Sequence, residues 1–255
     1  MISRGLMTGL ALALSAFVAA LPAQAQRPAA AGQNQPGDFD YYALVLSWSP
    51  SYCSGEGSGR NDPQCGPNRP YAFVLHGLWP QYTRGFPESC RTTFNPFVPR
   101  PVINGMLDIM PSPNLAIHEY RKHGTCSGLE PRPYFDTARK LFDKIKIPEI
   151  YRTLDRPLVT PVGDITKAFL AANPGLKPDM MGIACKRPNR MQEIRFCFSK
   201  EGEFKSCGSN ERQDRLCRSP SVYLPPVRAA AGRSGFFGRR PAPAPVVAPA
   251  GERKT

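Results

Sequence analysis

Eight cysteines constrain the fold of this chain more than any other feature of its sequence. They are Cys53, Cys65, Cys90, Cys126, Cys185, Cys197, Cys207 and Cys217. An even number of cysteines in an exported chain predicts disulfide bonds, here four. Structural zinc sites need close Cys-x-x-Cys pairs, and the sequence has none. Spacing alone leaves the alternative pairings open, but it predicts a disulfide-stapled fold that matures in an oxidising compartment.

The N-terminus predicts export. Residues 1–25 carry Arg4, an apolar run at residues 10–21, and the small-residue ending Ala-Gln-Ala. This is the pattern of a signal peptide that is cleaved before Gln26. The apolar run is shorter than the about 20 residues that a membrane span needs, so we expect no membrane span; an uncleaved anchor is the alternative. The expected location is periplasmic or secreted.

The composition divides the chain into four parts. Residues 1–25 form the signal peptide, and residues 26–37 are expected to be a flexible N-terminal segment. Residues 38–227 suit one domain with a sizeable core. Residues 228–255 are rich in Ala and Pro, lack apolar periodicity, and are expected to be a disordered basic tail.

The chain is basic, with a formal net charge of +13. The tail contributes six basic residues and one acid, so residues 38–227 are basic as well. A basic domain favours polyanionic partners, such as nucleic acid, anionic glycans or a membrane surface. The alternative is a solvated basic surface without a specific partner.

Apolar periodicity predicts an α+β domain, a largely antiparallel sheet packed against several helices. Strands are expected at residues 41–48, 71–75, 180–185, 192–199 and 203–206, and helices at 102–110, 114–122, 134–145 and 164–172. Asn114 is the expected N-cap of the second helix. A turn at residues 200–202 favours a hairpin between the last two strands.

All three histidines of the chain lie in two short segments, residues 76–80 (HGLWP) and 118–126 (HEYRKHGTC). Histidine has an ordinary pKa of about 6.5, so it can both take and give a proton near neutrality. A lone histidine is more often a satisfied polar residue than a catalyst. Here both segments also hold binding groups, namely Trp79, Glu119 and Lys122, and this concentration indicates an acid–base site.

The second segment predicts two functional faces on one helix. His118 and Lys122 are four residues apart and share a face, and Glu119 and His123 share another face rotated by about 100°. Zinc proteases of the His-Glu-x-x-His type need histidines four residues apart. His118 and His123 are five residues apart, so we expect no metal site, and a metal-dependent hydrolase is disfavoured.

This set of side chains fits the cleavage of an RNA phosphodiester. The reaction needs a base for the ribose 2′-OH, an acid for the leaving 5′-oxygen, and cations near the phosphoryl oxygens. His76 and His123 can supply the acid–base pair, and Lys122 and protonated His118 can hold the phosphate. Glu119 can tune a histidine or donate to the phosphoryl group. DNA lacks the 2′-OH, so no DNA cleavage is expected.

The two histidine segments, together with residues 42–53 (YALVLSWSPSYC), resemble the ribonuclease T2 family, most closely its bacterial exported branch. The resemblance covers residues 41–223. It implies an α+β fold on an antiparallel sheet. It also implies an endoribonuclease of broad base preference that cleaves single-stranded RNA through a 2′,3′-cyclic phosphate, without metal or other cofactor. We expect a monomer whose partner is its RNA substrate.

The resemblance also implies individual roles. His123 matches the general base for the 2′-OH, and His76 matches the general acid. His118 matches the phosphate-binding histidine. Glu119 and Lys122 match the pair that stabilises the pentacovalent state.

Trp79 matches an aromatic residue beside the cleaved nucleotide, where stacking on a base contributes about 1–3 kcal/mol. Its alternative role is ordinary core packing. Candidates for the base pockets are Gln81, Tyr82, Phe86 and the turn at residues 110–113.

Two positions depart from the family pattern. Tyr120 stands where tryptophan is common, and Arg121 where acidic residues are common. Arg121 either adds positive charge near the phosphate or points outward.

The family pattern pairs Cys90 with Cys126, and Cys185 with Cys217 around Cys197 with Cys207, which leaves Cys53 with Cys65. The bridge between Cys90 and Cys126 would hold the two histidine segments together, and losing such a bridge typically costs about 2–5 kcal/mol.

A rival hypothesis is a catalytically silent relative that holds RNA or an anionic glycan through its basic surface. The intact set of His76, Glu119, Lys122 and His123 argues against it, because a silent relative would be expected to lose at least one of them.

Overall fold

Strand β1, Tyr41–Trp48, is the centre of the fold, because both of its faces are buried. Its even-numbered side chains belong to the main apolar core, and its odd-numbered side chains form a smaller cluster with Cys197. A strand that is buried on both faces carries a nearly continuous apolar run. This explains why its sequence is apolar except at Ser47, which is half-buried.

The structure is a computed structural model that describes residues 34–55, 62–66 and 69–227. The expected signal peptide at residues 1–25, most of the segment 26–37, and the expected tail at 228–255 lie outside the described residues. Within the described part of the chain, each helix falls short of the length and apolar character that a bilayer crossing requires.

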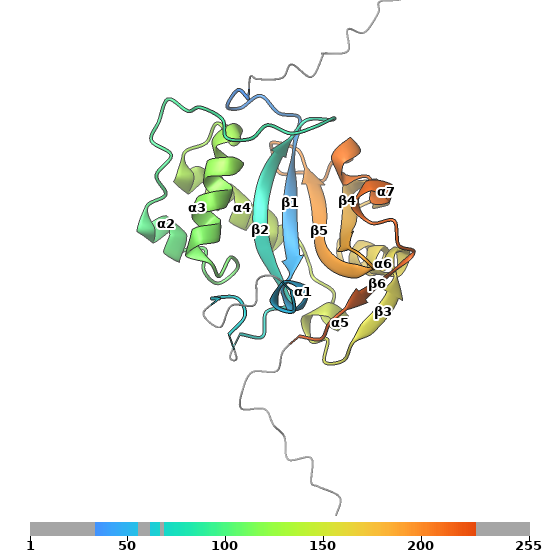
Figure 1. Ribbon diagram of the computed structural model, residues 1–255. Helices are drawn as coiled ribbons and strands as arrows, with labels where there is room; N and C mark the ends of the chain where they lie inside the picture. Colours follow the sequence, from blue (N-terminus) through green and yellow to red (C-terminus); the bar gives the residue numbers. More distant parts are fainter. Residues whose placement is uncertain (1–33, 56–61, 67–68, 228–255) are drawn as a thin grey trace, which may run out of the picture. The chain divides into compact units, whose positions relative to one another are not determined.

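Six strands form one sheet in the order β2-β1-β5-β6-β3, with β4 paired to β5. Their bounds are β2 Phe73–Gln81, β3 Leu158–Pro161, β4 Met181–Lys186, β5 Arg190–Phe198 and β6 Ser221–Leu224. The pairs are antiparallel except for β5 with β6, which are parallel. Strand β2 is therefore an edge strand of the sheet, as Figure 1 shows.

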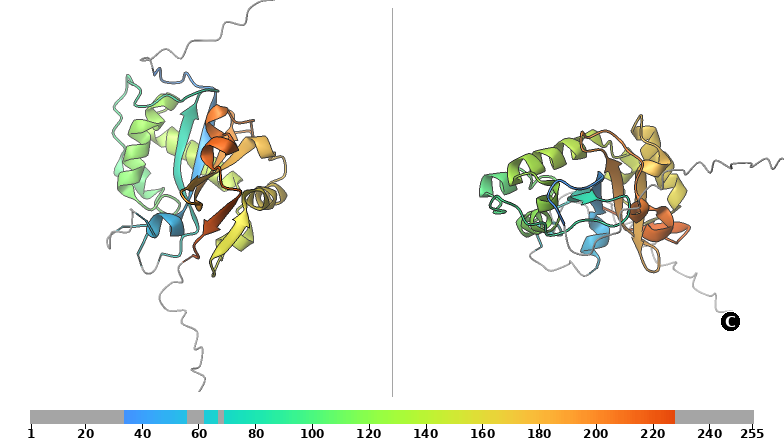
Figure 2. Two further views of the ribbon diagram at one scale, coloured as in Figure 1. Left: turned by 45° about the vertical axis from the view of Figure 1, so that its right-hand side comes forward. Right: turned by 90° about the horizontal axis from the view of Figure 1, so that it is seen from above.

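Helices flank both ends of this sheet. Helices α2 and α3 lie beside the β2 edge, α4 runs behind β2 and β1, and α6 and α7 lie on the side of the sheet away from β2 (Figures 1 and 2). The bounds are α1 Ser49–Cys53, α2 Arg100–Asn104, α3 Pro113–Lys122, α4 Pro131–Lys144, α5 Glu149–Arg152, α6 Val162–Ala172 and α7 Gln213–Leu216, with 3-10 helices η1 Gly124–Ser127, η2 Pro178–Met180 and η3 Ser209–Glu211. The fold is the expected α+β domain.

Helix α4 shows why these segments become helical. Its apolar residues recur at helical spacing, and one stripe of the helix is buried in the main core: Tyr134, Phe135, Ala138 and Leu141. Pro131 stands at its first position, where a missing N–H costs nothing. Helix α3 begins in the same way, but its N-cap is Ser112, whose side chain accepts a hydrogen bond from the Leu115 N–H at 3.3 Å. The expected cap at Asn114 is wrong.

Several other expected boundaries differ from the structure. The helix expected at 102–110 ends at Asn104, and a series of turns follows it. The expected strand at 203–206 is reduced to a single bridge between Phe198 and Phe204, although the turn at 200–202 forms. Strand β2 continues to Gln81 instead of ending before His76. This extension changes the site, because it makes His76 part of the sheet.

Four disulfides staple the domain, and their partners are the pairs that the family resemblance implies. They are Cys53–Cys65, Cys90–Cys126, Cys185–Cys217 and Cys197–Cys207. The second of these joins the loop after β2 to η1, directly after α3. A backbone hydrogen bond reinforces this junction: the Ser89 N–H donates to the Lys122 carbonyl at 2.7 Å.

Candidate active site

His76 occupies a β-bulge in strand β2. Val45 of β1 pairs with Gly77, and the next residue, Leu46, pairs with Leu75, so His76 is left without a partner on β1. A bulge inserts one residue, bends the strand and re-aims a side chain. The His76 side chain is about one-third exposed, at 32%. The edge strand thus presents an imidazole that the regular pleat would have aimed elsewhere.

Helix α3 brings the second set of groups to the same edge. Glu119 is 2% exposed and His123 is 6% exposed, so this face of the helix is turned inward. His123 is the C-cap of α3 and the N-cap of η1, and its N–H donates to the Glu119 carbonyl at 2.8 Å. The next turn is fixed by the disulfide at Cys126. His123 therefore sits at a rigid junction and not at a frayed helix end.

The Trp79 side chain joins the two segments. Its indole N–H donates to Glu119 Oε2 at 2.6 Å, and the other oxygen, Oε1, lies 3.6 Å from His76 Nε2. The indole ring stacks on the His123 ring, with centroids 4.9 Å apart and planes at 27°. The His76 ring meets it edge-on at 5.3 Å. Both imidazoles contact one aromatic ring, and one carboxylate lies beside it.

Gly77 permits this close approach. A Cβ atom at this position would overlap Glu119 Oε2 and Trp79 Nε1, the two atoms of the hydrogen bond just described. Any larger residue must push the carboxylate and the indole apart. The glycine of the HGLWP segment is thus required by packing at the site itself.

Strand β5 adds two charged residues that the sequence reasoning missed. Glu193 Oε2 lies 3.2 Å from His76 Nδ1, and Glu193 Oε1 accepts from Arg195 Nε and Nη2 at 3.0 and 2.7 Å. The Arg195 guanidinium also lies over the Trp79 ring at 4.9 Å. Alternation offered a signal: Glu193 and Arg195 interrupt an apolar strand at two-residue spacing, so both must share one face.

A further carboxylate, that of Glu211, contacts Arg195. Glu211, whose side chain is fully buried, lies 3.5 Å from Arg195 Nη1 and accepts a hydrogen bond from the Tyr41 hydroxyl. Burial raises the pKa of Glu211 above its ordinary value, and the Tyr41 hydrogen bond and the Arg195 charge counteract this. Arg195 is thus held between Glu193 and Glu211.

The surroundings move the pKa values of the two histidines in opposite directions. Burial lowers the pKa of His76, but the hydrogen bond to Glu193 and the charges of Glu119 and Glu193 outweigh it, so the pKa lies above 6.5. Burial and then the positive charge of Lys122 lower the pKa of His123 to about 3. At mildly acidic pH, His76 is therefore protonated and His123 is neutral.

The two carboxylates beside His76 also differ. Burial raises the pKa of Glu119, although the charge of His76 and the Trp79 hydrogen bond act against it. Burial also acts to raise the pKa of Glu193, but the His76 hydrogen bond and the Arg195 charge overcome it, so this pKa is lowered. Glu193 is the more strongly ionised of the two.

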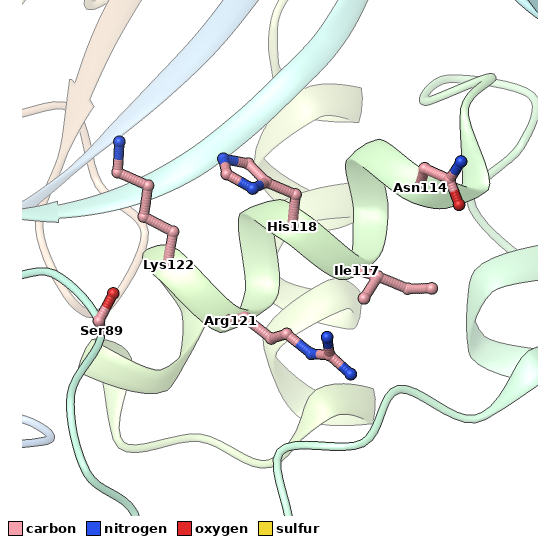
Figure 3. Close-up of a pocket in the computed structure, with 6 residues that line it drawn as sticks. All are labelled: Ser89, Asn114, Ile117, His118, Arg121 and Lys122. Atoms are coloured by element: carbon pink, nitrogen blue, oxygen red, sulfur yellow. The ribbon is translucent and has the colours of Figure 1, made fainter.

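A pocket of about 390 Å³ lies along α3, next to Ser89 of the loop that follows β2. Its lining is Ser89, Asn114, Ile117, His118, Arg121 and Lys122 (Figure 3). Figure 3 shows His118 and Lys122 extending the same way from one face of the helix, whereas Arg121 points away from them. Lys122 Nζ lies 3.8 Å from Glu88 Oε2, and both side chains are largely exposed. The pocket carries three basic side chains.

Arg121 is the third basic residue of the pocket. No carboxylate in the described part of the chain forms an ion pair with its guanidinium. The four titratable side chains of residues 118–123 named above lie on two sides of the helix. Glu119 and His123 face inward, and His118 and Lys122 face the pocket.

The candidate base-pocket residues have different surroundings. Phe86 is 49% exposed, and its ring centroid lies 6.4 Å from that of His123. Gln81 is buried, and its Oε1 accepts from Asn210 at 2.8 Å. In the turn at 110–113, Met110 lies in the main core, and Ser112 caps α3. Of the two aromatic candidates, Phe86 is exposed and Tyr82 is half-buried.

Residues 34–55, 62–66 and 69–227 contain no group of three or more His, Cys, Asp and Glu side chains that could hold a metal ion. The expectation of a metal-free reaction remains a prediction.

Comparisons with known proteins identify the family. The model of the ribonuclease T2 family matches residues 39–207, which hold both histidine segments. A ribonuclease of Aeromonas hydrophila is 35% identical over 77% of this chain and 90% of its own length. A probable ribonuclease of Haemophilus influenzae is 30% identical over 70% of this chain and 64% of its own length.

Solved structures show the same fold. The S-like ribonuclease trichomaglin superposes with a TM-score of 0.58 at 25% identity, over 74% of this chain and 99% of its own. The residues that the family model matches, 39–207, include strand β2 and helix α3. This chain belongs to the ribonuclease T2 family.

Proposed function

We propose that this enzyme cleaves single-stranded RNA by metal-independent transesterification, with His123 as the general base and His76 as the general acid. The observation that carries the proposal is the contact of both imidazoles with one Trp79 ring, in surroundings that give them opposite protonation states. A pair of groups whose pKa values are pushed apart is typical of acid–base catalysis.

His123 begins the reaction as the neutral ring. It takes the proton of the ribose 2′-OH, and the 2′-oxygen attacks the adjacent phosphorus. Its lowered pKa, which results from burial and the charge of Lys122, keeps it unprotonated at the pH of the reaction. Nδ1 of His123 is buried and has no hydrogen-bond partner among the described residues, so Nε2 is the nitrogen that is left to take the proton.

His76 completes the step as the protonated ring. The bond between phosphorus and the 5′-oxygen breaks, and the His76 proton moves to that oxygen, which leaves a 2′,3′-cyclic phosphate and a free 5′-hydroxyl. The carboxylates of Glu119 and Glu193 keep the ring protonated beforehand. After the step, His76 is neutral and His123 is protonated.

The negative charge that develops on the phosphoryl oxygens is stabilised by cations and donors from α3. Lys122 and His118 supply donors to these oxygens, and the Glu119 carboxylate beside them keeps His76 protonated. His118 and Lys122 also line the pocket with Arg121, and we infer that the RNA backbone continues past this basic surface.

Trp79 and Phe86 divide the aromatic roles. The Trp79 ring is engaged by His123 and Arg195, which supports a role in organising the site in addition to base stacking. Phe86 is exposed beside His123, so we infer that it offers the stacking surface for a base.

We further infer that the protein is exported, as a monomer, to the periplasm or the medium. The four disulfides support this location, because such bonds persist in oxidising compartments. N-terminal sequencing of the protein from its natural compartment is expected to begin at Gln26. Size-exclusion chromatography is expected to give the molecular mass of a monomer.

A DNA oligonucleotide with a single internal ribonucleotide tests the proposal. Incubated with chelator at pH 5–7, it is expected to be cut once, directly 3′ of the ribonucleotide, because only that position has a 2′-OH. The all-DNA oligonucleotide and the 2′-O-methyl version are controls that remain intact. Binding without cleavage would favour the silent relative, and cleavage that chelator abolishes would favour a metal-dependent hydrolase.

A further inference from the structure

We propose that Glu193 is a positioning residue for His76, and that Arg195 fixes Glu193 in the orientation this requires. The inference rests on the proposed function, in which His76 is the general acid. It concerns the second ring nitrogen, which does not face the scissile linkage. It gives Glu193 on β5, which is far in sequence from both histidine segments, a role in orienting the general acid.

The contact reaches across the sheet. His76 lies on β2 and Glu193 on β5, and β1 runs between these two strands. Glu193 pairs with Ser47 of β1, and Val45 pairs with both Arg195 and Gly77. The bulge turns His76 over this face, where Nδ1 meets Glu193 Oε2 at 3.2 Å. Bulge and register together produce the contact.

The contact fixes the ring through Nδ1. A carboxylate only accepts hydrogen bonds, so Nδ1 carries the proton of this interaction. Nε2 then points to the other side, where Glu119 Oε1 lies 3.6 Å away. A base or acid whose remote nitrogen is held by a carboxylate is locked in tautomer and orientation, and the near nitrogen is left for proton transfer.

Arg195 leaves Glu193 little freedom. Two guanidinium nitrogens donate to Oε1 at 2.7 and 3.0 Å, so Oε1 is occupied and Oε2 remains for His76. The opposite side of the guanidinium meets Glu211, and its plane lies over Trp79. The same arginine therefore aligns the partner of His76 and packs on the ring that both histidines contact.

The charges that act on His76 come from one strand and one helix. Glu193 and Arg195 face it from β5 and Glu119 faces it from α3, and Arg195 opposes the effect of the two carboxylates. His123 and Lys122 lie further along the same helix junction. Without the Glu193 charge, only Glu119 remains to counteract the effect of Arg195 on the His76 pKa. His76 is then expected to lose its proton at lower pH.

The pH profile of Glu193→Gln tests this role. Glutamine keeps an acceptor for Nδ1 but removes the charge. We expect the alkaline limb of kcat/KM on a dinucleotide to move to lower pH by about one unit, with kcat at pH 7 reduced about tenfold and KM within about twofold. Glu193→Asp keeps the charge and is expected to restore the position of the limb.

A control separates this role from general loss of charge. Glu149→Gln removes an exposed carboxylate of α5 that pairs with Arg152 at 3.6 Å, and it is expected to leave the profile unchanged. If the alkaline limb of the kcat/KM profile does not shift in a folded Glu193→Gln enzyme, the inference is overturned. The ion pair of Glu193 with Arg195 would then be merely structural.

Nitrogen NMR of the unaltered enzyme provides a measurement that needs no variant. We expect His76 to titrate above 6.5 and to keep its proton on Nδ1 when neutral. A neutral form protonated on Nε2 contradicts the inference. If His76→Ala retains full activity, the proposed function itself fails; if His76→Ala is inactive and the profile of Glu193→Gln does not move, only the role of Glu193 fails.

Discussion

Two identical side chains acquire different chemistry from their neighbours. His76 lies between two carboxylates, Glu119 and Glu193, and its pKa is raised. His123 is buried beside Lys122, and its pKa is lowered. Separation of pKa values by local charge is a general way to obtain an acid and a base at one pH. The difference follows from position in the fold, because the isolated residues would titrate alike.

Removing either imidazole is the simplest prediction at this scale. His76→Ala and His123→Ala are each expected to lower kcat/KM on a dinucleotide by about 10²–10⁴-fold, the usual contribution of a general acid or base. His118→Ala is the matched comparison, with a smaller loss expressed mainly in KM. Circular dichroism checks folding. A folded variant at position 76 or 123 that keeps more than about one-hundredth of the activity would contradict the assignment.

The pH dependence follows from the directions of the two shifts. Activity requires neutral His123 and protonated His76, so it is lost below about pH 3 and also above the raised pKa of His76. We expect kcat/KM to be level between about pH 4 and pH 6 and to fall tenfold per unit once His76 deprotonates. A profile that rises from pH 6 to pH 8 would reverse the assignment of the two rings.

The sequence identifies the residues of the two segments but not their partners. His76, Trp79, Glu119 and His123 stand in motifs, and the structure brings these four together. Glu193 stands in no such motif, and it lies between Gln192 and Ile194 in a strand of mixed character. Its contact depends on the register between β1 and β5, which pattern reasoning on one sequence does not supply.

At the scale of elements, the site depends on an irregular strand. The bulge in β2 places His76, and Gly77 after it leaves room for the hydrogen bond between Glu119 and Trp79. Irregularities of this kind are over-represented beside active sites. Sequence periodicity ends the strand before His76, because a bulge interrupts the pattern that periodicity detects.

Gly77→Ala tests this packing. The added methyl group overlaps Glu119 Oε2 and Trp79 Nε1, so we expect a large loss of kcat with the melting temperature lowered by a few degrees. Gly163→Ala on α6 is the matched control, since a Cβ there meets no atom within 4 Å. It is expected to keep full activity. Equal activity of the two variants would show that the close approach at Gly77 does not matter.

The disulfide Cys90–Cys126 joins the loop after β2 to the end of α3, across 36 positions. Replacing both cysteines by serine is expected to lower the free energy of unfolding by about 4 kcal/mol, by the entropy of a loop of this length. The shorter Cys53–Cys65 bridge closes 12 positions, away from α3, and is expected to stabilise by about 3 kcal/mol.

Activity distinguishes these two bridges more sharply than stability. Only the first adjoins His123, so only its loss is expected to lower kcat in protein that is still folded. Urea titration and single-turnover assays on both variants measure the two effects. A Cys90→Ser/Cys126→Ser enzyme with unchanged kcat would contradict the positioning role of the bridge.

Long elements are predictable from this sequence, and short ones are not. Strand β1 and helices α4 and α6 carry clear periodicity and lie within a few residues of their expected bounds. Elements α1, α5, β3 and β6 have five residues or fewer and carry too little pattern to be found. Their structure depends on tertiary partners, such as the pairing of β3 with β6.

At the scale of the whole molecule, the two faces of the sheet have different roles. One face packs on α4 and the main core, and the other bears Trp79, Arg195 and the acid–base pair at the β2 edge. Composition predicts the α+β class, but it does not say which face of β1 supports catalysis, because both faces are apolar in sequence.

The basic character of the chain predicts salt-sensitive binding. Arg121→Gln is expected to weaken binding of a non-cleavable 2′-O-methyl RNA and to reduce its salt slope by about 0.7, the value for one phosphate contact on a single strand. Cleavage of a dinucleotide, which is too short to reach this surface, is expected to be unchanged.

Arg156→Gln is the control for this charge effect. Arg156 is exposed and precedes β3, at the edge of the sheet opposite β2, so its removal should leave the slope unaltered. Fluorescence anisotropy over a range of salt concentrations gives both slopes. Equal slopes for the two variants would mean that the RNA does not follow the pocket beside α3.

The most direct test of the central claim replaces the leaving oxygen of a dinucleotide by sulfur. A 5′-thiolate leaves without a proton, so His76→Ala is expected to lose about 10²–10⁴-fold on the oxygen substrate and to approach the unaltered enzyme on the sulfur substrate. His123→Ala is expected to lose activity on both, since the 2′-OH still needs a base. Rescue of His123→Ala instead, or of neither variant, would contradict the assignment of the two histidines.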